Sequence, residues 1–168
     1  MRSLTILFMI VLTASAMADS PQAIEWVKLR ALTAGETQEE KTAHLRAHGL
    51  DKSSSIAVLD YVDHGEDAIR EEGRKDLVRR CKNRAVLEND AEAFAKDVEE
   101  SIAREQAIYN GLIDNIPVLL SKRAADGVKA ALAHGGEVSV FETKVAEHIR
   151  AGDIDLKATF NRMCGDDK

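Results

Sequence analysis

The apolar residues of this chain recur at helical spacing, and this periodicity is the strongest constraint on its fold. Between Phe94 and Ile116, apolar side chains return at intervals close to 3.6 residues, which places them on one face of a helix. The members of this face are Phe94, Val98, Ile102, Tyr109, Leu112 and Ile116. Alternating β-branched runs bounded by turn residues, which are typical of strands, are scarce. The sequence therefore predicts a chain built from helices.

Helix boundary signals recur along the chain and support the same fold class. Ser20 followed by Pro21 is typical of an N-cap with proline at the first helical position. Thr37 and Glu40 have the spacing of a capping box, and Asp155 can cap a last short helix. We therefore expect an all-α fold, an irregular bundle of seven or eight short to medium helices with short links.

Several helix ends are predicted from glycine and proline. The helix opening at Ser53 to Ser55 is expected to stop near Gly65, with a new helix starting at Glu66. The long amphipathic helix is expected to end before Pro117, because the residue before a proline avoids the helical region. The next helix is expected over 118–133. Apolar residues at 138, 141, 145 and 149 predict a further helix, which Gly152 ends.

The first 18 residues have the pattern of a secretory signal peptide. Arg2 supplies a positive charge, residues 4–12 form an apolar run, and Ala16 and Ala18 fit the A-x-A rule for cleavage before residue 19. A second candidate cleavage site follows the segment 14–16. The apolar run is shorter than the roughly 20 residues that span a bilayer, so an uncleaved anchor is the less favoured alternative. We therefore expect export to a bacterial periplasm or to the extracellular space.

Cleavage would leave 150 residues, which we expect to form a single helical domain over 19–168 with no transmembrane segment. The full chain carries a net charge of −6, and loss of Arg2 makes it −7. An acidic protein is poorly suited to nucleic acid, which rewards clustered lysine and arginine. Aromatic residues make up only 4% of the chain, which argues against a stacking surface for bases or sugars.

The chain has two cysteines, Cys81 and Cys164, and both lie after the predicted cleavage site. In an oxidising compartment, an even pair far apart in sequence favours a disulfide. Closing a loop of about 80 residues would stabilise the fold by on the order of 4 kcal/mol in the chain-entropy account. Two free thiols or an intermolecular bridge are the alternatives, and a redox pair is disfavoured because there is no C-x-x-C.

Charge is concentrated in two neighbouring segments of opposite sign. Residues 70–84 carry a net +4, whereas residues 88–105 carry a net −5. One interpretation is that the two helices pack as an antiparallel hairpin with complementary faces. The other is that the basic helix docks an acidic protein or an anionic surface. The candidate partner-binding residues are Arg74, Arg79, Arg80, Lys82 and Arg84.

A helical face with two histidines is a candidate metal site. Glu40, His44 and His48 follow one another at intervals of four residues and so lie along one face. Zinc binds two helical histidines at this spacing, although such sites usually carry a motif such as H-E-x-x-H, which this chain lacks. Solvent-exposed histidines are the alternative interpretation.

The chain contains none of the common catalytic signatures, neither G-x-S-x-G nor the phosphate-binding glycine motifs. Glu100-Ser101 resembles the Glu-Ser pair of lytic transglycosylases, exported helical enzymes in which a buried glutamic acid protonates a glycosidic oxygen. The Gly-Leu-Met-Gln stretch of that family is replaced here by Gly111-Leu112-Ile113-Asp114. The resemblance implies a cell-wall glycan-cleaving enzyme.

We therefore rank three functions. The first is an exported, non-enzymatic protein that binds another macromolecule, as an inhibitor, an immunity-type protein or an accessory subunit would. The second is a metal- or small-ligand-binding module that uses the Glu40, His44 and His48 face. The third is a cell-wall hydrolase. No cofactor is predicted for the first.

Overall fold

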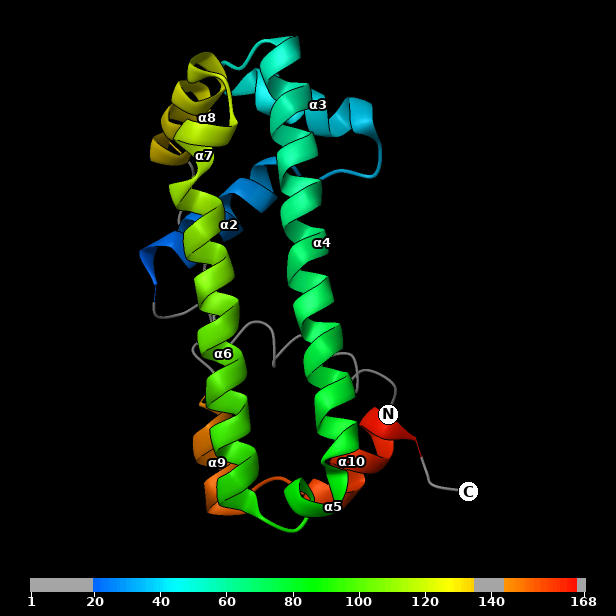
Figure 1. Ribbon diagram of the computed structural model, residues 1–168. Coiled ribbons are helices and arrows are strands. Elements are labelled where there is room, and N and C mark those ends of the chain that lie inside the picture. The colour runs from blue at the N-terminus through cyan, green and yellow to red at the C-terminus, as the bar shows by residue number, and fades with distance from the viewer. Residues whose placement is uncertain (1–19, 135–143, 166–168) are drawn as a thin grey trace. The chain divides into compact units, whose positions relative to one another are not determined.

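The computed structural model describes residues 20–134 and 144–165. The predicted signal peptide, 1–18, and positions 138 and 141 of a predicted helix lie outside these ranges. Within them the fold is all-α, as predicted, with nine helices and no strand. The helices are α2 Pro21–Leu32, α3 Gln38–Ala47, α4 Lys52–Lys82, α5 Arg84–Leu87, α6 Ala91–Asp114, α7 Ile116–Leu119, α8 Lys122–His134, α9 Val145–Ala151 and α10 Leu156–Cys164 (Figure 1). In the part of the chain so described, none of them combines the length and the apolarity that a membrane crossing requires.

Three of the predicted helix starts, at Ser20, Thr37 and Asp155, are confirmed. Ser20 caps α2 by accepting a hydrogen bond from the Ala23 N–H at 3.0 Å, with Pro21 as the first helical residue. The capping box of α3 is complete, since Thr37 and Glu40 each bond the other's backbone N–H. Asp155 caps α10, and α9 ends at Gly152 with a φ of 78°. These ends depend on neighbours in sequence, which is why the sequence predicted them.

The predicted break at Gly65 is wrong, because α4 runs without interruption for 31 residues. Gly65 is buried inside this helix, and a Cβ atom added to it would lie 2.4 Å from Cη2 of Trp26. The glycine therefore makes room for an aromatic ring on another helix and does not end its own helix. Joining the two predicted helices makes α4 longer than the short to medium helices expected.

The predicted helix end before Pro117 is displaced. Helix α6 ends at Asp114, and Pro117 lies in the first turn of the short helix α7. A proline in the first turn lacks only an N–H that would have no partner within the helix in any case. The single turns α5 and α7 account for a helix count above the seven or eight predicted.

The described residues group into two compact units. The division falls inside α4 and α6, so each unit contains a stretch of both helices, lying side by side (Figure 1). We call residues 70–106 and 144–165 the disulfide unit, and residues 20–69 and 107–134 the tryptophan unit.

The core of the disulfide unit brings α9 and α10 against α6. Phe94 and Phe160 lie at its centre, with ring centroids 5.1 Å apart, and Val98 and Ile149 are buried with them. The predicted bridge between Cys81 and Cys164 is present and joins the end of α4 to the last residue of α10. The disulfide thus fixes the C-terminal helix to its own unit, where a terminal segment would otherwise fray.

An exposed ion-pair bridge joins α9 to α6 within the same unit. Arg150 contacts Glu92 at 2.8 Å and Glu99 at 2.6 Å. Hydrogen bonds from the Arg150 guanidinium lower the pKa of both carboxyl groups. The bridge gives α9 a defined position on the acidic face of α6.

The core of the tryptophan unit is centred on Trp26, which is fully buried. Its ring meets Tyr61 edge-on, with centroids 6.5 Å apart, and its indole N–H donates to Glu66 at 3.2 Å. The Tyr61 hydroxyl donates to the Leu112 carbonyl, which ties α4 to α6, and burial raises the pKa of this hydroxyl. These contacts fix the two helices whose facing stretches form the concave surface described below.

Candidate functional site

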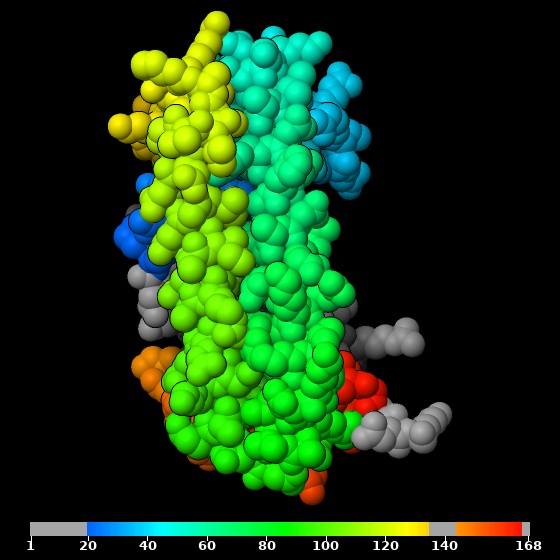
Figure 2. Space-filling view, in the orientation of Figure 1, coloured from blue at the N-terminus to red at the C-terminus, as the bar shows by residue number. Residues whose placement is uncertain are grey.

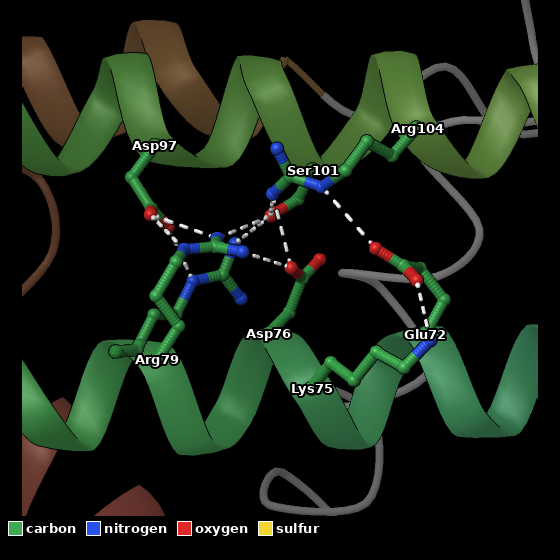
Figure 3. Close-up of polar contacts among 8 residues, drawn as sticks. Glu72, Lys75, Asp76, Arg79, Asp97, Ser101 and Arg104 are labelled. Atoms are coloured by element: carbon green, nitrogen blue, oxygen red, sulfur yellow. Dashed lines mark hydrogen bonds and ion pairs between the residues drawn. The ribbon is translucent and has the colours of Figure 1, made fainter.

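Two of the predicted partner-binding arginines point from α4 toward α6 in the disulfide unit (Figure 3). Arg79 Nη2 lies 2.8 Å from Oδ1 of Asp97, and Arg80 Nε lies 2.6 Å from Oδ2 of the same carboxylate. Arg80 is only 7% exposed and also lies over the Phe94 ring, 5.8 Å from its centroid. Both arginines therefore pair with α6, Arg80 as a buried side chain and Arg79 as a side chain that is 34% exposed.

Ser101 lies at the centre of this network. Its hydroxyl oxygen accepts hydrogen bonds from Arg80 at 2.8 Å and from Arg79 and Arg104 at 3.2 Å each (Figure 3). Arg104 also pairs with Asp76 at 3.0 Å. Burial raises the pKa of Asp76, but the hydrogen bonds from Ser101, Arg79 and Arg104 outweigh this effect and hold the pKa below its ordinary value. Glu72, whose carboxylate lies 3.3 Å from Nε of Arg104, is the third carboxylate for the three arginines, so the cluster is a charge-compensated packing contact.

Arg84 is also used internally. It pairs with Glu88 at 2.9 Å, donates to the Gly165 carbonyl at 3.1 Å and contacts Asn161. It therefore links the segment after α4 to the end of α10. Of the two interpretations of the charged segments, complementary packing of the two helices describes Arg79 and Arg80, whereas Arg84 pairs with Glu88 four residues further on and with the end of α10.

The remaining basic residues form an exposed strip on α4. We define the basic strip as Arg74, Lys75, Val78 and Lys82, which line a shallow hollow of about 320 Å³ together with Arg79. The Arg74 side chain is 69% exposed and pairs with Glu71 at 2.9 Å. Lys82 is exposed and makes no ion pair with any residue in the described ranges. Of the predicted partner-binding residues, Arg74 and Lys82 belong to this strip, and Arg79 lines the same hollow.

The predicted metal-binding face on α3 does not assemble a site. The Glu40 carboxylate accepts hydrogen bonds from the backbone N–H groups of Glu36 and Thr37, and these hydrogen bonds lower its pKa. The Nδ1 atoms of His44 and His48 lie 2.8 Å and 2.9 Å from the carbonyls of Ala34 and His44. Among residues 20–134 and 144–165, no three histidine, cysteine or acidic side chains are placed to hold a metal ion.

The Glu100-Ser101 pair lacks the surroundings that its resemblance to lytic transglycosylases implies. Glu100 is exposed on α6, whereas the acid of those enzymes is buried. The hydroxyl oxygen of Ser101 already accepts hydrogen bonds from three guanidinium groups.

The sequence did not point to the concave surface in the tryptophan unit. It lies between the first half of α4 and the end of α6, includes Leu119 of α7 in its lining, and has a volume of about 650 Å³. We call it the α7 groove. Its apolar walls include Ala57, Tyr61, Ile108, Gly111, Leu112 and Leu119. Both long walls, the turquoise stretch of α4 and the yellow-green stretch of α6, lie on the face drawn in Figure 2.

Two large apolar side chains on α7 are exposed to solvent beside this groove. Val118 is 77% exposed and Leu119 is 65% exposed, and Leu119 also lines the groove. In the sequence these residues belong to an apolar run after Pro117, which we had assigned to the start of the next helix. Only the three-dimensional fold shows which side chains of the run are buried and which are exposed.

No protein-family model matches this chain, and comparisons with curated proteins and with solved structures give no match either.

Proposed function

We propose that this protein is an exported, non-enzymatic binding protein that captures an apolar segment of a partner protein in the α7 groove. The observation that carries the proposal is the exposure of Val118 and Leu119 beside an apolar groove of about 650 Å³. Exposed apolar side chains that adjoin such a groove are typical of a protein-interaction surface. A groove between two helices matches the apolar face of a partner helix.

The charges beside the groove favour a partner with basic residues. Asp60 lines the groove, and Asp114 is exposed at the end of α6. Neither carboxylate forms an ion pair with another residue of the described segments. Lysine or arginine flanking the apolar face of the partner would therefore meet uncompensated negative charge, which speeds association and fixes register.

Two features support export, one in the sequence and one in the fold. Residues 1–18 have the signal pattern, and the Cys81–Cys164 disulfide fits an oxidising compartment. The binding surface would then meet its partner outside the cytoplasm.

The test uses the chain from Asp19 onward, with its disulfide formed, as bait for the exported fraction of its own cell. The captured partner is identified, purified and titrated against the bait by calorimetry. We expect Val118→Asp/Leu119→Asp to weaken binding by a factor of about 10 or more, since each change places a charge where apolar surface is buried.

The chain offers a matched control. Val86 is exposed by 61% and lies in the disulfide unit, so Val86→Asp makes the same chemical change away from both the groove and the basic strip. The control should bind as the unchanged protein does. Equal binding by Val118→Asp/Leu119→Asp would refute the groove as the site. Loss of binding in Arg74→Glu/Lys82→Glu alone would instead assign the partner to the basic strip.

A second copy of the chain is the competing occupant of the groove. Sedimentation equilibrium of the purified protein measures self-association directly. If the protein forms a dimer and Val118→Asp/Leu119→Asp dissociates it, the occupant of the groove is a second copy of the chain and not a different protein.

A further inference from the structure

The tryptophan unit contains a second concave surface, distinct from the α7 groove. It is a cleft of about 590 Å³ between α2, the end of α6, α7 and α8. Its apolar walls include Ile113, Ile116, Pro117, Val128 and Leu132. Small-molecule sites in proteins are clefts of roughly this size, mainly apolar, with a few polar groups that orient the ligand. We call it the α2–α8 cleft.

Four charged residues line the cleft along with these walls. Lys28 and Glu25 come from α2, and Lys129 and Asp126 come from α8. Asp126 is already compensated, because Lys122 lies 2.6 Å from its carboxylate. Within residues 20–134 and 144–165, neither lysine of the cleft has an ion-pair or hydrogen-bond partner. The four charges that line the cleft sum to zero, and counting Lys122, which pairs with Asp126 beside the cleft, leaves one positive charge there in an acidic protein.

We propose that the α2–α8 cleft binds a single-chain carboxylate amphiphile, such as a fatty acid. The alkyl chain would lie against the apolar walls, where its removal from water drives binding. The carboxylate would accept charge-assisted hydrogen bonds from Lys28 and Lys129, which hold the two ammonium groups of the cleft.

Other ligand classes fit the cleft less well. A nucleotide or an aromatic sugar ligand would need a stacking surface, and no aromatic side chain is among the described residues that line the cleft. A cationic or uncharged amphiphile would leave both lysines without a counter-ion. A carboxylate on an alkyl chain uses both the apolar walls and the lysines.

This inference is independent of the proposed partner. Ile116 and Pro117 of α7 line the cleft, whereas Leu119 lines the α7 groove. Substitutions in the groove leave the cleft lysines in place, and substitutions of the lysines leave Val118 and Leu119 in place. One site can therefore fail its test while the other passes.

The test is a calorimetric titration of the chain from Asp19 onward with sodium dodecanoate, below the concentration at which it forms micelles. Dodecyltrimethylammonium, with the same alkyl chain and the opposite charge, is the matched probe. We expect one dodecanoate per chain and no saturable binding of the cation. Lys28→Gln/Lys129→Gln should weaken dodecanoate binding about tenfold or more, because both charge-assisted hydrogen bonds are lost.

Two further variants keep the test decisive. Lys52→Gln/Lys157→Gln changes the same net charge at exposed positions away from the cleft and should bind dodecanoate as the unchanged protein does. Ala125→Trp fills the cleft and should abolish binding even if the lysine variant proves too unstable to study. Circular dichroism confirms the fold of each variant.

Three results would overturn the inference. They are absence of saturable dodecanoate binding, equal affinity for the cationic probe, and unchanged binding by folded Lys28→Gln/Lys129→Gln or by Ala125→Trp.

Discussion

Ser101 shows how a single hydroxyl can organise a set of arginines. Its oxygen receives three guanidinium donors, and Asp76 and Asp97 supply the negative charge around it. Because these arginines pair with carboxylates on α4 and α6, the most arginine-rich part of the chain does not offer a uniformly basic surface. The opposite charges of the segments 70–84 and 88–105 predicted that the two helices could attract each other. They could not predict which arginines would face inward, because that depends on the rotation of α4 against α6.

Asp97 is the residue whose loss should destabilise the disulfide unit most directly. In Asp97→Ala, Arg80 would remain almost fully buried without the carboxylate that now lies 2.6 Å away. Removing one partner of a buried ion pair costs about 3 kcal/mol or more. We expect a loss of that size in the free energy of unfolding, measured by urea denaturation. Glu100→Ala, at an exposed position on the same helix, should change it by less than about 0.5 kcal/mol. Equal losses in the two variants would contradict the role assigned to Asp97.

The lowered pKa of Asp76 leads us to expect a specific dependence of stability on pH. Its pKa is lowered in the folded protein, so the ionised carboxylate favours the folded state. This contribution is complete above the ordinary aspartate pKa of about 3.9 and is lost as the pH falls through the lower, folded value. We expect Asp76→Asn to be less stable than the unchanged protein at pH 6 and to lose less stability on acidification.

The measurement is urea denaturation at a series of pH values from about 6 down to about 2, across the interval in which the contribution of Asp76 is lost. Other carboxyl groups with lowered pKa values, such as Glu92 and Glu99, are present in both proteins. Their contribution cancels in the difference between the two stability curves. Curves that run parallel from neutral to acidic pH would show that Asp76 does not contribute in this way.

Helix α4 owes its continuity to the fit between Gly65 and Trp26. A glycine inside a helix is usually unfavourable by about 0.5–1 kcal/mol relative to alanine. Here the absent Cβ is what allows the indole ring to pack against the helix backbone. The fit brings α2 onto α4 and so helps to fix one wall of the α7 groove.

Gly65→Ala should therefore destabilise the protein despite its higher helix propensity. The new methyl group would lie 2.4 Å from Cη2 of Trp26, and overpacking of this kind costs about 1–3 kcal/mol. Gly73→Ala is the matched control in the same helix, since a Cβ there meets nothing within 4 Å. The control should be neutral or gain up to about 1 kcal/mol.

Thermal unfolding and the fluorescence of Trp26, the only tryptophan in the chain, report both changes. Adding Trp26→Phe, a smaller ring, should relieve part of the clash in Gly65→Ala. If Gly65→Ala and Gly73→Ala proved equally stable, the spacer role of Gly65 would have to be abandoned.

At the scale of elements, the sequence was informative where the cause was local. The caps at Ser20, Thr37 and Asp155 depend on residues three positions away, and each was predicted correctly. Gly65 was misread because the group that requires a glycine, Trp26, comes from another helix. The α7 groove was missed for a related reason, since its walls come from segments more than 40 residues apart.

At the scale of the molecule, the one disulfide acts within one of the two units. Both cysteines lie in the disulfide unit, 83 residues apart in sequence, and the loop between them also contains residues 107–134 of the tryptophan unit, whereas residues 20–69 lie outside it. Crosslinking over this separation removes many conformations of the unfolded chain. The stabilisation should therefore be large for a chain of this length and should be felt first in α9 and α10.

Cys81→Ser/Cys164→Ser tests this expectation. The chain-entropy account gives a loss of about 4 kcal/mol in the free energy of unfolding. Urea denaturation measures the loss, and a reductant added to the unchanged protein should reproduce it while leaving the variant unaffected. Amide hydrogen exchange locates the effect. Peptides from 144–165 should lose protection before those from 20–69, because only the former lie in the unit that the bridge closes. If exchange instead rose equally in both units, the bridge would stabilise the chain as a whole, and the assignment of its effect to one unit would be wrong.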